Sequence, residues 1–133
     1  MTQLELSEKP RIVEELVTEA RRRGVRIRLL LMDKGFYSGE VIEKLKSMGV
    51  KFLIAVPKGR RVKREVMDHI RSGEGRVRRF TLRRGGERVG FNLTIHRLRR
   101  SKKDLRNILE LYGAFATNLG PKRAAEAWRW IPE

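Results

Sequence analysis

Asp33 stands where a side chain could do chemistry. It follows the aliphatic run 27–32, which only Arg28 interrupts, and it precedes the turn residues Lys34 and Gly35. In an open α/β sheet, functional side chains gather at the carboxyl ends of strands, where the chain turns out of the sheet beside helix N-termini. The plainer interpretation is that Asp33 ends the strand and shapes the turn, and position alone favours it.

The positive charge of the chain is concentrated in one segment. The net charge is +16, from 32 lysines and arginines against 16 acidic residues. Residues 58–103 contain 17 basic and 4 acidic residues, whereas 1–57 contain 11 and 8, and 104–133 contain 4 and 4. Such a field attracts polyanions before any specific contact forms. The alternatives are a solvated charged surface or a membrane-binding face, and the lack of an opposite Trp- and Leu-rich face disfavours the membrane. We therefore expect nucleic acid as the partner.

A β-hairpin is expected within this basic segment. Residues alternate between apolar and polar over 77–84, reach the pair Gly85-Gly86, and alternate again over 89–95. Period-two segments on both sides of a glycine turn predict a long hairpin. We expect phosphate contacts from the arginines on and beside its strands: Arg78, Arg79, Arg83, Arg84, Arg88, Arg97, Arg99 and Arg100.

Composition excludes several other kinds of site. The chain has no cysteine, so it has neither a disulfide framework nor a thiolate metal site. His69 and His96 are far apart in the sequence, and we interpret each as a surface or hairpin residue rather than a ligand. No apolar run is long enough to span a bilayer, and the N-terminus lacks the order of a signal peptide. We therefore expect no membrane partner and a cytoplasmic, nucleoid-associated protein.

The remaining pattern indicates one α/β domain. Ser38 is placed to cap a helix, and a glycine follows each of three helical patterns. Trp128 and Trp130 are two positions apart on an expected helix, so we expect one in the core and the other at its rim. In chain order we expect a helix over 10–23, a buried parallel strand over 27–32, a helix between Ser38 and Gly49, a strand over 52–56, a weaker helix before Gly73, the hairpin, a strand over 111–117 and a closing helix over 122–130.

Two motifs resemble those of a known family. Segment 31–38 reads Leu-Met-Asp-Lys-Gly-Phe-Tyr-Ser, and it closely resembles the second-aspartate motif of the DDE transposases of insertion sequences. The best match is to the class with a β-rich insertion before the catalytic glutamate. In that class a later strand ends in Thr-Asn, and a helix then carries Tyr, two residues, Arg, three residues and Glu. Thr117-Asn118 matches the pair, and Arg129 and Glu133 have the required separation.

The resemblance implies a fold, an activity and a site. The fold would be a partial RNase H-like α/β domain over 1–133, without the first three strands of the family's sheet and with a basic β-rich insertion over about 58–103. The activity would be DNA binding, with DNA cleavage and strand transfer in transposition. Asp33 and Glu133 would be catalytic metal ligands for Mg²⁺ or Mn²⁺, and Arg129 would lie near the DNA backbone.

The sequence also departs from the family's pattern. Glu126 stands at the position of the motif's Tyr, Pro132 precedes Glu133, and the family's first aspartate has no counterpart because residues 1–32 contain no Asp. We therefore expect this chain to be incomplete and inactive alone, and to associate with a second copy or with a complementing transposase fragment. Two alternatives stay open: a non-catalytic nucleic-acid-binding module, and a decayed transposase remnant.

Overall fold

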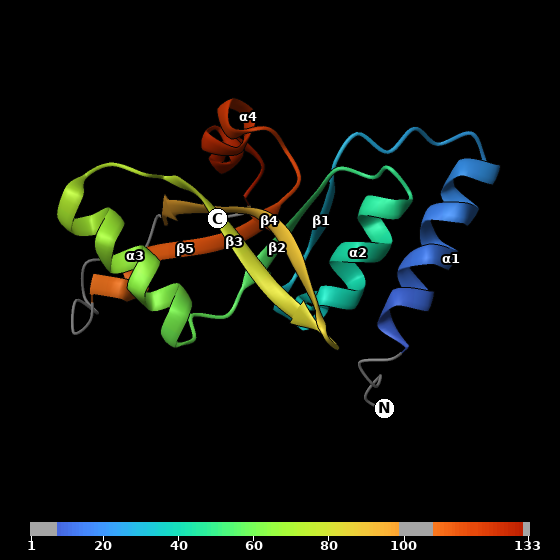
Figure 1. The fold of residues 1–133 in the computed structure, drawn as a ribbon. Coiled ribbons are helices and arrows are strands. Elements are labelled where there is room, and N and C mark those ends of the chain that lie inside the picture. Colours follow the sequence, from blue (N-terminus) through green and yellow to red (C-terminus); the bar gives the residue numbers. More distant parts are fainter. Residues whose placement is uncertain (1–7, 99–107, 132–133) are drawn as a thin grey trace.

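A mixed five-stranded sheet forms the centre of the molecule. The computed structural model describes residues 8–98 and 108–131 (Figure 1). The strand order is β1-β2-β5-β4-β3, with β1 parallel to β2 and every other neighbouring pair antiparallel. The strands are β1 (Leu30–Met32), β2 (Phe52–Val56), β3 (Val77–Arg84), β4 (Glu87–Arg97) and β5 (Tyr112–Thr117). The expected mixed α/β class is confirmed.

The helices lie on both faces of this sheet (Figure 1). One face is covered by α1 (Lys9–Arg22), α2 (Gly39–Ser47) and α3 (Arg60–Ser72), which contribute buried valines to a core shared with β2, β4 and β5. On the other face lies α4 (Pro121–Ala125), where the Thr94 hydroxyl donates to the Ala124 carbonyl oxygen at 2.9 Å. Three 3₁₀ turns complete the described chain: η1 (Lys34–Phe36), η3 (Ile108–Leu111) and η4 (Ala127–Trp130).

Local sequence signals placed two helix ends as expected. The Ser38 hydroxyl caps α2 by accepting a hydrogen bond from the Val41 backbone N–H at 3.1 Å. Gly73 ends α3 with φ of 71°, a left-handed conformation that suits glycine because it has no Cβ. These signals act over three or four residues, which is why the sequence alone located them.

The hairpin is a structural part of the sheet. Its strands pair from Val77↔Thr94 to Arg84↔Glu87, as the alternation predicted. β4 also pairs with β5, from Asn92↔Thr117 to Arg97↔Tyr112, so the hairpin extends the sheet from β5 outward. Val89, Phe91, Leu93 and Ile95 are buried on the face that α2 covers.

Three expectations about the core were wrong. The strand expected over 27–32 has only three residues, and it lies at one end of the sheet with Leu31 45% exposed rather than buried. The closing helix is broken at Glu126 into α4 and η4, and both Trp128 and Trp130 are exposed. Both tryptophans lie on η4 and not on a continuation of α4, and neither indole ring is buried in the core.

Both histidines are buried: His69 is not the surface residue that we expected, whereas His96 does lie on a strand of the hairpin. His96 lies on β4 beneath α4 and is 2% exposed, because β4 is covered on both faces toward its end. His69 lies on α3, with Nδ1 2.7 Å from the Glu74 carbonyl oxygen. Within residues 8–98 and 108–131, no helix is both long and apolar enough to cross a membrane.

Candidate nucleic-acid interface

Asp33 occupies the turn between β1 and η1. Its backbone is extended, and its Oδ1 accepts a hydrogen bond from the Gly35 N–H at 2.8 Å, which caps the turn. Lys9 Nζ donates to the Gly35 carbonyl oxygen and lies 5.7 Å from the centre of the Phe36 ring. Asp33 is exposed to solvent, so its carboxylate is accessible although it accepts this hydrogen bond.

A largely apolar cavity of about 300 Å³ lies beside Asp33. It is formed at the end of β1 by residues of β1, β2 and β5 and by the last described residues: Leu31, Met32, Asp33, Leu53, Ala55, Phe115, Trp130 and Ile131. The C-terminal segment therefore packs next to the turn that holds Asp33, although the two are about a hundred positions apart in the chain.

The helical segment that carries Arg129 is short. Helical backbone ends at Trp130, and Ile131 is extended, with φ of −80° and ψ of 122°, as expected for the residue before a proline. Arg129 lies 3.8 Å from the Glu126 carboxylate and stacks at 5.6 Å on the Trp128 ring. Glu133 lies outside the described residues, so its proposed role as a metal ligand stays a prediction.

The described residues do not form a magnesium site by themselves. Among residues 8–98 and 108–131, no three His, Cys, Asp or Glu side chains come together in a group that could hold a metal ion. Asp33 is the single carboxylate among the described residues that line its cavity, and two-metal catalysis requires several oxygen ligands.

The arginines of the hairpin are divided between the two faces of its strands. Arg79, Arg83 and Arg88 lie on the face opposite Phe80 and Phe91. Arg83 and Arg88 are directly opposite each other in the register, and both are exposed. Neither makes an ion pair within the described chain. The hairpin tip therefore carries uncompensated positive charge at this pair. Like charges directly opposite each other destabilise a strand pair.

Two other predicted phosphate contacts have partners within the protein. The Arg78 guanidinium is 3.0 Å from the Glu65 carboxylate and 2.6 Å from that of Asp68, with the side chain 17% exposed. Arg79 reaches Asn92 Oδ1 at 3.5 Å. Arg84 is exposed opposite Glu87, and Arg97 is exposed at the end of β4. Arg99 and Arg100 lie outside the described residues.

The hairpin tip packs against the helix that follows the Asp33 turn. A Cβ added at Gly39, the first residue of α2, would lie 3.2 Å from the Arg84 Cβ and 3.4 Å from the Arg83 carbonyl oxygen. Lys46, near the other end of α2, donates to the Gly90 carbonyl oxygen at 3.1 Å. The structure thus brings the basic hairpin and the Asp33 segment together through α2.

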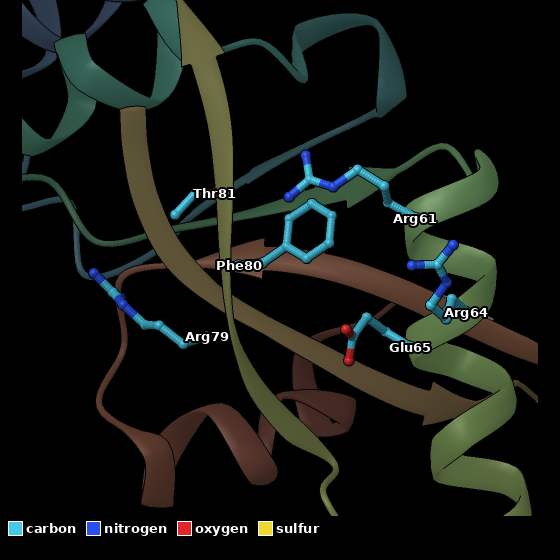
Figure 2. Close-up of a pocket in the computed structure, with 6 residues that line it drawn as sticks. All are labelled: Arg61, Arg64, Glu65, Arg79, Phe80 and Thr81. Carbon is cyan, nitrogen blue, oxygen red and sulfur yellow. The ribbon is translucent and has the colours of Figure 1, made fainter. Parts of the chain in front are cut away.

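Sequence reasoning missed two arginines on α3. Arg61 and Arg64 line a cavity of about 190 Å³ between α3 and β3, shown in Figure 2. The available signal was the run 58–64, in which five of seven residues are basic. That run indicates a concentration of positive charge, but it does not indicate which of its side chains line a cavity.

The fold and this site define an α/β domain that carries an aspartate at a strand end and an arginine-rich hairpin beside it. The family model for the transposase DDE domain matches residues 7–118, so the chain belongs to that family. The matched range includes Asp33 and the whole hairpin, and it ends before Arg129 and Glu133. No curated protein and no solved structure matches the chain.

Proposed function

We propose that this chain binds duplex DNA through the β3–β4 hairpin and acts in the transposition of an insertion-sequence element. The observation that carries the proposal is the exposed pair Arg83 and Arg88, which face each other without an acidic partner in the described chain. Membership of the transposase DDE domain family supports a function in DNA transposition.

Arg83 and Arg88 form an unfavourable pair in the free protein. Like charges on opposite strands repel, and a bound phosphate between or beside them removes that repulsion. Each phosphate contact also releases a counterion from the DNA, which makes affinity fall with salt. Arg79 and Arg83 are four positions apart on β3, or about 13 Å along the strand, so they would contact different phosphates.

The test is the salt dependence of binding to a fluorescent duplex. The logarithm of affinity should fall against the logarithm of salt concentration with a slope near −0.9 per phosphate contact. Replacing Arg83, Arg84 and Arg88 together by Ala should flatten that slope. The matched control replaces Arg21, Arg22 and Arg23, of which two already pair with Glu19, and it should change the slope less. Affinity that is unchanged from low to high salt contradicts DNA binding by this surface.

We propose further that the 133-residue polypeptide alone neither nicks nor joins DNA in Mg²⁺ or Mn²⁺. The family's first aspartate has no counterpart before Asp33, and the described residues offer one carboxylate at the cavity. Supplying the family's upstream strands, fused or as a second chain, should make Asp33 and Glu133 essential for cleavage.

Cleavage by the unaided chain that Asp33→Ala abolishes would contradict an incomplete site. No cleavage even with the upstream strands supplied would favour the non-catalytic binding module or the decayed remnant over a transposase fragment. DNA binding is measured on the same preparations, so failure of binding and failure of cleavage are separate results.

A further inference from the structure

The cavity between α3 and β3 lies at the free edge of the sheet, because β3 is the last strand in the sheet order. Three of its lining residues come from α3 and three from β3: Arg61, Arg64, Glu65, Arg79, Phe80 and Thr81. Its volume of about 190 Å³ compares with ~30 Å³ for each water molecule in the liquid, so it has room for a phosphate group with its bridging waters.

The charge around this cavity is positive. The carboxylate of Glu65 is bound by Arg78 at 3.0 Å, and Arg78 also binds Asp68. Neither Arg61 nor Arg64 makes an ion pair within the described chain. Of the lining side chains, three carry a guanidinium group and one carries a carboxylate, and that carboxylate already binds Arg78.

Arg61 is held in position by an aromatic ring. Its guanidinium carbon lies 4.4 Å from the centre of the Phe80 ring, and Phe80 itself is 7% exposed. Phe80 packs against Phe91 with 5.7 Å between ring centres, so the ring is fixed by the core. A guanidinium that stacks on a ring keeps its N–H donors in its own plane, where they can bind two oxygens of one phosphate.

The arginines approach the edge strand from both sides. Figure 2 shows Arg61 and Phe80 on one side of β3, and Arg79 and Thr81 on the other. Arg61 and Arg64 come from α3, so they are separate from the hairpin tip. On that other side the Arg79 guanidinium donates to Asn92 Oδ1 at 3.5 Å, so an anion in the cavity beside Phe80 meets the two guanidinium groups of α3.

We infer that this cavity is a phosphate site, in which Arg61 and Arg64 bind a backbone phosphate of the DNA. The inference rests on the proposed DNA binding and adds α3 and the free edge of β3 to the surface that DNA covers. Phe80 is a positioning residue because it contacts Arg61 and not the phosphate. In this inference the bound phosphate is part of a DNA strand. Free inorganic phosphate could make the same contacts with the two arginines, so the experiment must distinguish these two ligands.

The experiment compares Arg61→Gln, Arg64→Gln and the double variant with the wild-type chain in binding to a 16-base-pair duplex at several salt concentrations. Because the two arginines bind the same phosphate, the double variant should make the salt slope shallower by about 0.9, and each single variant should produce part of that change. The matched control is Arg71→Gln, which removes one exposed positive charge from the last turn of the same helix and should leave the slope near the wild-type value. Equal slopes for Arg61→Gln and Arg71→Gln would overturn the inference.

Nuclear magnetic resonance of the arginine Nε–Hε groups distinguishes the two sources of phosphate. Stoichiometric duplex should shift the signals of Arg61 and Arg64, and inorganic phosphate at the same concentration should not. Shifts with inorganic phosphate and none with duplex would overturn the inference in favour of a free-anion site. If the wild-type chain binds no DNA, both the proposed function and this inference are wrong. If the chain binds DNA but the variants of Arg61 and Arg64 bind it equally well, only the phosphate site in the cavity is wrong.

Discussion

The basic hairpin and the Asp33 turn meet at α2, but they are built in different ways. The hairpin consists of two long strands with eight register pairs, and its arginines are placed by a local alternation of side chains. The Asp33 turn follows a three-residue strand, and its carboxylate caps its own turn. A charged surface can be complete within one continuous segment, whereas the two-metal site that the family resemblance implies would take its carboxylates from separate elements.

The two regions also depend on one shared side chain. Phe91 of β4 lies 5.7 Å from Phe80, which supports Arg61, and 6.1 Å in an edge-on arrangement from Tyr37, which follows the Asp33 turn. Burial raises the pKa of Tyr37 to about 12, and the charge of Arg61 opposes that shift only in part. Electrostatic influence thus reaches from the α3 cavity to the segment after Asp33.

The largest effect is expected from Phe91→Ala. Phe91 is 1% exposed, and removing a buried phenyl ring costs about 3 to 5 kcal/mol of unfolding free energy. Because Phe91 contacts both aromatic neighbours, the hairpin and the Asp33 segment should lose protection from hydrogen exchange together. Urea denaturation gives the free energy, and Trp128→Ala, at a side chain 52% exposed, is the control that should change it by about 0.5 kcal/mol or less. Independent unfolding of the hairpin would contradict the shared core.

Local patterns predicted the hairpin better than they predicted the site. Alternation and the glycine pair were sufficient for β3 and β4, and Ser38 for the start of α2, because those signals act between near neighbours. The match of 31–38 to a family motif identified Asp33 as a candidate site residue, and its position after the aliphatic run favoured a role in the turn, which the hydrogen bond from Gly35 N–H bears out. The break at Glu126 and the stacking of Arg61 on Phe80 depend on contacts between distant segments, which no periodicity encodes.

His96 should make the stability of the hairpin sheet depend on pH. Burial, and then the charge of Arg76, lower the pKa of His96 to about 4. The Thr94 hydroxyl donates to the Ala124 carbonyl oxygen, so His96 Nε2 donates to Thr94 at 2.7 Å, and His96 Nδ1 has no partner in the described chain. A second proton on His96 would therefore be buried without an acceptor.

The direction of the effect follows from the two pKa values. The unfolded chain has its His96 pKa near 6.5, above the folded value, so it binds more protons between about pH 6.5 and pH 4. Stability should fall by about 3 kcal/mol from this group as pH decreases through that window. The measurement is the difference in unfolding free energy between the wild-type chain and His96→Gln, which should shrink from pH 7 to pH 4. A difference that is constant with pH would show that His96 is not buried in its neutral form.

Asp33 can be tested as a structural residue separately from any catalytic role. Removing the cap at Gly35 with Asp33→Ala should cost about 1 kcal/mol, whereas Asp33→Asn keeps an oxygen acceptor and should retain most of the stability. Both variants remove a negative charge near the basic hairpin, so duplex DNA should bind each slightly more tightly than the wild type. Thermal unfolding and fluorescence anisotropy provide the two measurements. Equal stability of the two variants would show that the hydrogen bond from Gly35 N–H to Asp33 does not stabilise the turn.

The smallest effect is expected at Gly90, where the hairpin positions one arginine. A Cβ at Gly90 would lie 2.8 Å from Arg79 Nη2, so Gly90→Ala must displace that guanidinium from its place across the strands. Stability should change little, because the displaced atom is the end of a flexible side chain. The DNA salt slope should become shallower by up to about 0.9, the contribution of one contact. Gly86→Ala is the matched control, since a Cβ there meets no atom within 4 Å, and it should leave the slope unchanged. If both glycine variants bind as the wild type does, the position of Arg79 over Gly90 does not contribute, and the hairpin's affinity comes from its tip alone.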